Sequence, residues 1–172
     1  MIKNKIINIF IYLLILCINT IPMQAMDTAE DTKLDFKHYE NSINSNYTLK
    51  TIEAYDRHLN DAPIGHICYT LVPYDKTGII QELVVVREQQ NKGLGSQLFL
   101  MALDDARTKN MQNVEWSSTR KALNFYKRFG ANIITTPLTM ANSLSLRMKF
   151  VFDQDGDPKE NLKQYYLSSL EN

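Results

Sequence analysis

The most constraining feature of the sequence is a glycine-containing turn between an apolar run and a helix-like segment. The apolar run covers residues 79–86, and the turn reads Gln-Asn-Lys-Gly-Leu-Gly over residues 90–95, with the helix-like segment directly after it. This order predicts a strand, a tight turn and a helix. Glycines at such a junction let backbone N–H groups approach an anion, and the helix N-terminus adds partial positive charge. The pattern therefore suggests a phosphate-binding turn, although a plain tight connection would give the same pattern.

Two common nucleotide-binding motifs do not fit this turn. A P-loop needs a glycine, four residues and then Gly-Lys followed by serine or threonine, and the sequence contains no such run. A dinucleotide-binding fingerprint needs a third glycine or an alanine at the position where this chain has Leu98. Neither nucleotide-binding fold is supported by the sequence.

A second block, further along the chain, strengthens the interpretation of the turn as a phosphate-binding turn. It reads Ala-Leu-Asn-Phe-Tyr-Lys-Arg-Phe-Gly-Ala over residues 122–131, which is typical of a short helix that ends at a glycine. Together the two blocks resemble the GNAT family of N-acetyltransferases. The acetyl-CoA loop of that family is Arg/Gln-x-x-Gly-x-Gly/Ala, and its later helix carries Phe-Tyr-x-x-x-Gly. The second block is most similar to the diamine and polyamine acetyltransferase branch, and the resemblance covers residues 47–152.

Hydrophobic periodicity and turn residues predict the secondary structure. The alternating runs indicate strands at 47–55, 64–74, 79–86, 114–118 and 143–152, and the helical patterns cover 94–108, 122–129 and 161–170. The first two strands flank a turn at residues 60–63 and should form an antiparallel hairpin. The resemblance implies an α/β (α+β) fold: a mixed, mostly antiparallel sheet of about six strands with helices on both faces.

The resemblance also divides the chain into parts. The acetyltransferase domain is residues 47–152, a polar lead-in covers 26–46, and a C-terminal extension covers 153–172. The polar lead-in should contribute little to the core, and it leaves little room for the helices that the family places before its first hairpin. We expect those helices to be reduced. The acceptor site should then be more open, or be completed by the C-terminal tail or by the second subunit of a homodimer.

The resemblance assigns the cofactor site to the turn and the strand before it. Backbone amides from Asn91 to Ser96 would bind the pyrophosphate of acetyl-CoA, and Gln90 occupies the Arg/Gln position of the family loop. The strand would offer edge groups to the pantetheine arm, or else be an ordinary core strand. The predicted cofactor-binding residues are Leu83, Val84, Val85, Gln90, Asn91, Lys92, Gly93, Leu94, Gly95 and Ser96.

The resemblance likewise assigns the catalytic residues. Tyr126 matches the general acid of the family, which would protonate the departing thiolate, and its plain alternative is a tyrosine packed on the sheet. Glu82 is the predicted base for the amine. The diamine branch has two adjacent acids here, whereas this chain has Gln81 before Glu82, so Glu115 or solvent is the alternative base. Thr119 stands where many family members have asparagine.

Several residues keep two interpretations at this stage. Lys121, Lys127 and Arg128 either neutralise the 3′-phosphate of the cofactor or form a solvated helix face. Trp116 either lines the acceptor site or belongs to the core. Cys68 is expected to be a small buried hydrophobic residue on its strand.

Charge and ligand spacing exclude other function classes. Lysine plus arginine and aspartate plus glutamate both number 19, so no basic excess indicates a nucleic-acid partner. His38, His58 and His66 have no carboxylate or cysteine at metal-ligand spacing. In residues 153–157 the glycine is fourth, not sixth as in a calcium loop, so a polar turn is expected. We expect no metal.

The first 25 residues have the order of a secretory signal. Lys3 and Lys5 precede an apolar run at 6–18, and Ala25 stands before the acidic flank that begins at Asp27. The run is shorter than a membrane span, so cleavage is expected, with a membrane anchor or a buried N-terminal element as alternatives. The domain is predicted to be secreted or periplasmic, and to meet a membrane only through this signal.

The sequence thus predicts an acetyl-CoA-dependent N-acetyltransferase that moves an acetyl group directly to a primary amine. The acceptor would be a small amine such as a polyamine, or a protein amine. Because acetyl-CoA is cytosolic, an exported enzyme of this kind would be an effector that acts inside another cell. The alternative is a catalytically idle module that keeps the fold and binds acyl-CoA or a partner.

Overall fold

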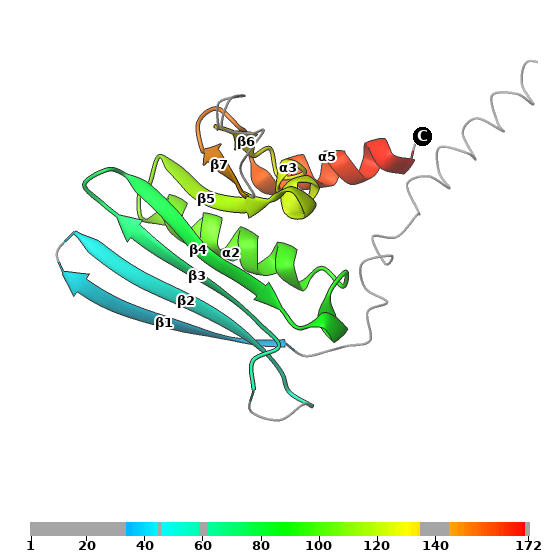
Figure 1. The fold of residues 1–172 in the computed structure, drawn as a ribbon, viewed down its shortest axis with the longest axis horizontal. Helices are drawn as coiled ribbons and strands as arrows, with labels where there is room; N and C mark the ends of the chain where they lie inside the picture. Colours follow the sequence, from blue (N-terminus) through cyan, green and yellow to red (C-terminus); the bar gives the residue numbers. More distant parts are fainter. Residues whose placement is uncertain (1–33, 45, 59–61, 135–144, 171–172) are drawn as a thin grey trace, which may run out of the picture. The chain divides into compact units, whose positions relative to one another are not determined.

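The computed structural model describes residues 34–44, 46–58, 62–134 and 145–170, which Figure 1 shows as a ribbon. Seven strands form one sheet in the order β1-β2-β3-β4-β5-β7-β6. All neighbouring pairs are antiparallel except β4 and β5, which are parallel. This confirms the predicted mixed, mostly antiparallel sheet, with one strand more than expected. The strands are β1 (Leu34–Asn44), β2 (Tyr47–Asp56), β3 (Gly65–Val72), β4 (Thr77–Val85), β5 (Asn113–Thr119), β6 (Asn132–Ile133) and β7 (Ser145–Val151).

The first four strands form an antiparallel meander whose residues alternate between two faces. Ile52, Ile67 and Leu83 lie opposite one another in three successive strands, and the two isoleucines are fully buried. We call the face that carries Ile52 and Ile67 the inner face. On the opposite, outer face, His66 is half-buried and Val84 is 40% exposed. This is the two-residue period expected of a sheet with one packed face.

Helix α2 (Leu94–Thr108) packs on the inner face and has the predicted bounds. A Cβ added to Gly65 would lie 3.2 Å from the side chain of Leu94 and 3.3 Å from that of Leu98. A Cβ on Gly78 would lie 3.6 Å from Ala106. The two glycines therefore let both ends of the helix lie close to the sheet, as the apolar spacing of the helix predicts.

Phe99 of α2 is the centre of the aromatic core. Its ring centroid lies 5.2 Å from those of Trp116 and Tyr126 and 4.9 Å from that of Phe129. These rings join α2 to β5 and to the segment predicted as a helix at 122–129. That segment is a 3₁₀ turn, η3 (Arg120–Ala122), followed by the short helix α3 (Leu123–Lys127). The helix is shorter than predicted, and its last turn leads into Gly130 at φ 92°.

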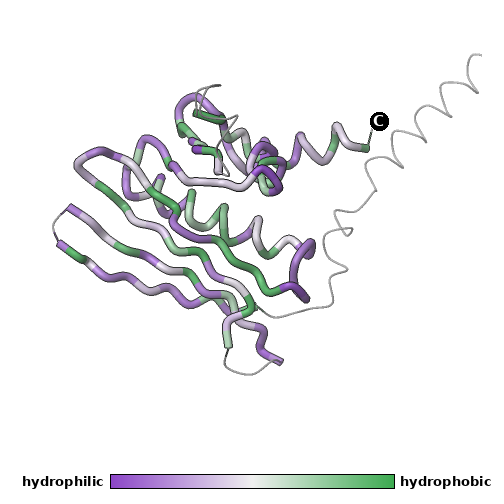
Figure 2. Tube along the Cα trace, viewed as in Figure 1, coloured by the Kyte–Doolittle hydropathy of each residue, from purple (hydrophilic) through white to green (hydrophobic). Residues whose placement is uncertain are grey.

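The polar stretch predicted as a lead-in forms strand β1 from residue 34 onward. Hydrophilic residues run along much of this strand in Figure 2, and only Leu34 and Phe36 pack against the core. Its backbone pairs with β2 along its length. An edge strand held by backbone pairing needs few apolar side chains, which is why the composition did not reveal it. Residues 1–33 lie outside the described part of the chain, and the predicted signal lies there.

The remaining helix is α5 (Pro158–Leu170), which begins three residues before the predicted one. Helices on both faces were expected, and the structure places α2 on the inner face. The helices that the family places before its first hairpin would fall outside the described residues. None of the described helices is long and apolar enough to cross a membrane.

A buried ionic cluster ties β2 and β3 to α2. The Lys50 Nζ atom donates to both carboxylate oxygens of Asp105, at 2.8 and 2.9 Å, and the Tyr69 hydroxyl donates to Asp105 at 2.9 Å. Burial alone lowers the pKa of Lys50, but the hydrogen bonds and charges of Asp105 and Glu40 outweigh it and raise that pKa. Lys50 therefore stays charged inside the fold, with its side chain only 10% exposed.

Replacing Asp105 by asparagine should destabilise the fold, because it leaves the Lys50 ammonium without its main counter-charge. We expect a loss of about 2 kcal/mol in the free energy of unfolding, less than for a fully buried pair. Urea denaturation of the variant and of the unmodified protein measures this difference in the free energy of unfolding. The neighbouring Asp104→Asn variant is the control, since Asp104 bonds only the exposed Lys159 at 2.7 Å. Equal losses in the two variants would contradict the assigned role of Asp105.

Candidate functional site

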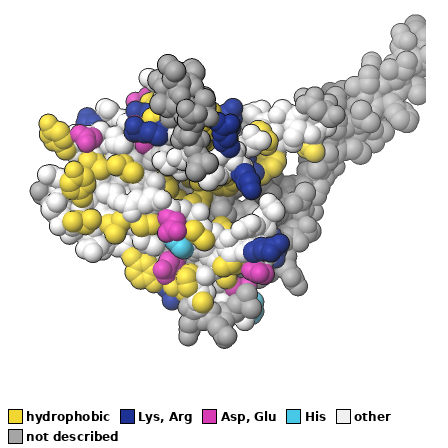
Figure 3. All heavy atoms as spheres, viewed as in Figure 1, with side chains coloured by type: hydrophobic (Ala, Val, Ile, Leu, Met, Phe, Trp, Pro, Cys, Tyr) yellow, Lys and Arg dark blue, Asp and Glu magenta, His cyan; other side chains and the backbone are white. Residues whose placement is uncertain are grey.

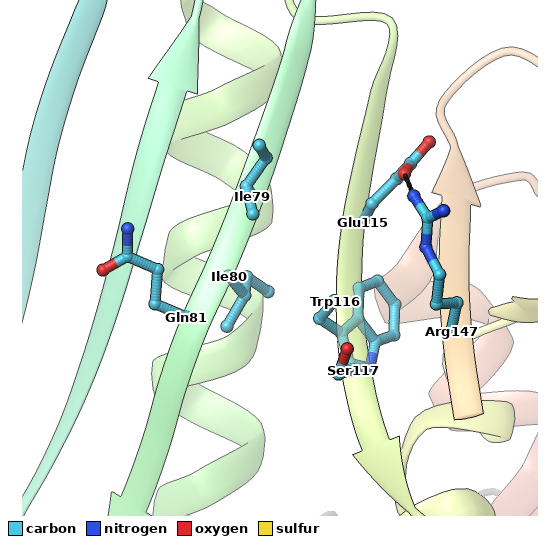
Figure 4. A pocket seen from close by; sticks show the side chains of 7 residues that line it. All are labelled: Ile79, Ile80, Gln81, Glu115, Trp116, Ser117 and Arg147. Atoms are coloured by element: carbon cyan, nitrogen blue, oxygen red, sulfur yellow. Dashed lines mark hydrogen bonds and ion pairs between the residues drawn. The ribbon is translucent and has the colours of Figure 1, made fainter. Parts of the chain in front are cut away.

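The candidate site begins where β4 and β5 part. Parallel pairing joins Thr77–Ile80 to Asn113–Trp116, and both strands continue beyond it. A bulge in the pairing with β3 leaves Gln81 as an extra residue of β4, and bulges bend a strand. Figure 4 shows the two strands diverging beyond Ile80 and Trp116. Within the described residues, the β5-facing edge of residues 81–85 has no strand partner.

A cavity of about 510 Å³ lies between the end of β4, the glycine turn, the start of α2 and helix α3. Most of the residues that the sequence assigned to the cofactor line it, together with the predicted acid and two of the three cations. These are Leu83, Val85, Gln90, Asn91, Gly93, Gly95, Ser96, Lys121, Tyr126 and Arg128. The fold thus brings the turn at 90–95 and the block at 122–131 to one cavity.

The turn presents an open helix N-terminus to this cavity. Gly93 is the N-cap of α2 at φ 88°, and no side chain caps the helix or places an acid in its first turn. Asn91 also has a positive φ, 61°, and the Gln90 side-chain amide donates to the Val85 carbonyl at 2.9 Å, which ties the turn to β4. First-turn N–H groups without a cap and without an acid suit an anion.

Three predicted cofactor residues do not line the cavity with their side chains. Val84 lies on the outer face, Lys92 is exposed at the turn, and Leu94 is buried in the core under α2. Lys127, one of the three uncertain cations, is exposed and lies away from the cavity lining. Any role of Val84, Lys92 and Leu94 toward a ligand would rest on their backbone groups.

Tyr126 lies on α3 at the wall of the cavity and is 9% exposed. Its ring centroid is 4.8 Å from that of Phe125 and 5.0 Å from that of Trp116. Burial raises the pKa of the Tyr126 phenol, so the protonated form persists to higher pH than in water. The tyrosine is therefore both packed in the core and open to the cavity.

Glu82, the predicted base, lies on the outer face of β4. Its carboxylate oxygen is 3.2 Å from His66 Nε2, and Glu53 lies across the strands from His66. Figure 3 shows acidic side chains and a histidine gathered on this face among hydrophobic ones. From the sequence, His66 is predicted only to lie on a strand. The carboxylate–imidazole pair could have been found from the hairpin register, once the bulge at Gln81 was known.

A smaller cavity of about 280 Å³ lies between β4 and β5 and is lined by Trp116, Gln81 and Glu115, among others. Glu115, the alternative base, is held by Arg147 at 2.9 Å and by Lys149 at 3.2 Å. The carboxylate of Glu115 is therefore engaged by two cations. Trp116 is buried, as its interpretation as a core residue predicts, and it also lines this cavity.

The C-terminal helix supplies a cavity residue that the sequence did not indicate. Tyr166 of α5 lines the larger cavity, and its hydroxyl accepts a hydrogen bond from Arg128 Nη1 at 3.2 Å. The Arg128 guanidinium also stacks over the Phe125 ring, 4.6 Å from its centroid. No motif marks Tyr166, because its position follows only from how α5 packs beside α3. The extension thus reaches the predicted cofactor side.

Cys68 and the acidic segment at 153–157 both lie in the described part of the chain. Cys68 is half-buried on the outer face, rather than buried, with its thiol 3.6 Å from the Gln81 side-chain oxygen. The acidic segment at 153–157 is a turn in which Asp155 accepts from the Val151 amide at 2.6 Å. Within the described ranges, no group of three histidine, cysteine, aspartate or glutamate side chains could hold a metal ion.

Comparison with known proteins places this geometry in a family. A family model described as the Acetyltransferase (GNAT) family matches residues 21–131. Nourseothricin acetyltransferase has a similar structure, with a TM-score of 0.51 and 17% identity over 60% of this chain and 65% of that one. So has the PaiA N-acetyltransferase of Thermoplasma acidophilum in complex with coenzyme A, at the same TM-score and identity over 60% and 61%.

A putative N-acetyltransferase from Lactobacillus plantarum also has a TM-score of 0.51, with 17% identity over 60% of this chain and 68% of that one. No match was found among curated proteins. At these identities the likeness to solved structures establishes the fold, and the chain spans less than two thirds of the first two proteins. The family model covers more than half of the chain, which therefore belongs to the GNAT family of acetyltransferases.

Proposed function

We propose that the protein is an acetyl-CoA-dependent N-acetyltransferase that transfers the acetyl group directly to a primary amine. The observation that carries this proposal is the larger cavity. An uncapped helix N-terminus, the open edge of β4 and the buried phenol of Tyr126 all meet there. A long ligand with a phosphate end and a reactive thioester end would match these three features in that order. The PaiA protein that shares the fold was solved with coenzyme A.

The first-turn amides of α2 would bind the pyrophosphate, because they offer N–H groups with no competing cap. Lys121 and Arg128, on the opposite wall, would neutralise the remaining phosphate charge. The unpaired edge of residues 81–85 would form backbone hydrogen bonds with the pantetheine arm, in the way that a sheet edge binds an added strand. Gln90, whose amide bonds Val85, would keep the turn and this edge in register.

The residues near the thioester end of the bound ligand would supply the proton transfers of the reaction. The thioester supplies an activated acyl carbon to which the neutral amine nitrogen forms a bond while the carbon–sulfur bond breaks. The amine gives up one proton to Glu82, directly or through His66 or water, and the sulfur takes one proton from Tyr126. Glu82 then releases its proton to solvent and Tyr126 takes one up from solvent, so an acetamide and a free thiol result and the enzyme is unchanged.

The acceptor is proposed to be a primary amine, either on a small molecule such as a polyamine or on a protein. Glu82 and Glu53 on the outer face would favour a cation, which fits an ammonium group before it loses its proton. The diamine and polyamine branch remains one proposal among these amines. Thiol release from acetyl-CoA with polyamines, amino acids and peptide N-termini would rank them.

Replacing Gly95 by glutamate should strongly weaken cofactor binding without unfolding the chain. A side chain at Gly95 points toward Phe125 and Val85 of the cavity, at 3.6 and 3.7 Å, and a carboxylate would repel the pyrophosphate. An acid in the first turn is otherwise favourable to a helix. We expect the dissociation constant for acetyl-CoA, measured by calorimetry, to rise by about 100-fold, or about 2.7 kcal/mol.

The matched control is Gln97→Glu, which adds the same charge to the first turn at an exposed position outside the cavity lining. It should bind acetyl-CoA almost as the unmodified protein does. If the unmodified protein shows no heat with acetyl-CoA and no rise in melting temperature, the proposed function is wrong.

Replacing Tyr126 by phenylalanine should lower kcat by about 100-fold, because the thiolate loses its proton donor. Acetyl-CoA affinity should hardly change, since the ring and its packing stay. Tyr74→Phe, at an 89% exposed position, is the control. Because burial raises the pKa of Tyr126, kcat of the unmodified enzyme should not fall as pH rises through about 10, the ordinary value for a phenol.

This variant also separates the enzyme from the idle acyl-CoA-binding module. A module without turnover binds acetyl-CoA and releases no thiol with any amine, whatever stands at position 126. An enzyme loses turnover in Tyr126→Phe and keeps binding. A fall of kcat with a midpoint well below pH 10 would contradict Tyr126 as the acid.

Export is proposed from the sequence of residues 1–25, with the enzyme then acting inside another cell where acetyl-CoA is present. The basic start, the apolar run and the small residue before Asp27 support it. A reporter that is active only outside the cytosol, fused after Asp27, should be active. The same fusion with Lys3 and Lys5 kept and the apolar run made polar should be inactive, and activity retained in that control would contradict a signal.

A further inference from the structure

The indole of Trp116 carries a buried polar atom that has no hydrogen-bond partner among the described residues. Among buried side-chain nitrogen and oxygen atoms of the described residues, only Trp116 Nε1 has no hydrogen-bond partner. The residue is 4% exposed, so water reaches it poorly. A buried donor without an acceptor costs about 1 to 3 kcal/mol, and such groups in a native fold need an explanation.

The position of Trp116 suggests what the acceptor is. Trp116 pairs with Ile80 in the last rung of the parallel ladder, just before β4 and β5 part. Its side chain lines the smaller cavity between these strands. In Figure 4 the indole nitrogen lies at the edge of the ring nearest the C-terminal end of β5, on the side where the strands diverge. The donor is therefore buried at the end of the indole toward which the strands diverge.

The same indole touches the predicted acid. The Trp116 and Tyr126 ring centroids are 5.0 Å apart, and Tyr126 belongs to the wall of the larger cavity. Trp116 thus stands between the cavity proposed for the coenzyme and the cavity between the strands. Phe99 packs against both rings, at 5.2 Å from each, and fixes their relative orientation.

We propose that Trp116 Nε1–H donates a hydrogen bond to the carbonyl oxygen of the thioester. This inference rests on the proposed function and adds a catalytic residue to it. During transfer, the bond from the amine nitrogen to the acyl carbon forms while the carbon–sulfur bond breaks, and negative charge develops on that oxygen. A fixed donor in a buried site stabilises this charge with little reorganisation. Tyr126 protonates the sulfur, so the two side chains act on different atoms.

The chain allows an unusually direct test, because Trp116 is its single tryptophan. A nitrogen-15 spectrum of the labelled protein has one indole N–H signal. We expect this signal to move downfield when acetyl-CoA is added and to stay in place with coenzyme A, which lacks the acyl carbonyl. An equal shift with both ligands, or a shift only on addition of an amine, would overturn the assignment.

Two variants test the catalytic effect. Trp116→Phe removes the donor and keeps an aromatic ring, and replacement of the indole by benzothiophene exchanges the N–H for sulfur with nearly the same shape. Each should lower kcat by about 10- to 100-fold. The benzothiophene protein guards against a folding defect in Trp116→Phe, because its packing against Phe99 is preserved. Unchanged kcat in the benzothiophene protein would overturn the proposal.

Calorimetry on the same samples separates the inference from the proposed function. If acetyl-CoA binds and the indole signal does not respond, the role of Trp116 is wrong and the acetyltransferase proposal stands. If acetyl-CoA gives no heat with the unmodified protein, both fail. Binding together with the downfield shift and the loss of kcat supports both.

Discussion

The separation of β4 from β5 is the constraint on which the candidate site depends. The parallel ladder ends at the pair of Ile80 and Trp116, and the bulge at Gln81 bends β4 just beyond it. A sheet normally satisfies the backbone groups of its inner strands, so an open edge in the middle of a sheet is costly unless another chain or a ligand pairs with it. Both cavities lie along this opening, and the first-turn amides of α2 lie at its end.

The opening between β4 and β5 is stable because the core on the inner face beneath it is tightly packed. Phe99 joins α2 to Trp116, Tyr126 and Phe129, so the helix that carries the turn is fixed to the strand and helix that carry the proposed chemistry. Lys50, Tyr69 and Asp105 fasten the same helix to β2 and β3. Packing and buried charge thus hold α2 on the inner face, while β4 and β5 remain apart above it.

Sequence patterns predicted the parts of this arrangement that local rules determine. The helix at Leu94–Thr108 and the strands around it follow from apolar periodicity, and the glycine turn follows from its composition. Strand β1 was missed because pairing with β2 holds it. The pair of His66 and Glu82, the approach of Tyr166 to Arg128 and the unpartnered indole depend on register and packing between distant segments. No local pattern contains that information.

The larger cavity and the outer face of β4 differ in charge, and this difference gives the proposed reaction a direction. Lys121, Arg128 and the α2 amides surround the larger one, which suits a ligand with several phosphates. On the outer face, Glu82 and Glu53 flank His66, which suits a cationic amine. An anionic coenzyme and a cationic acceptor would therefore approach from different sides and meet where the strands part. Tyr126 and Trp116 are in contact at that point, so the proposed acid for the sulfur and the proposed donor for the carbonyl oxygen would lie where the acyl group is transferred.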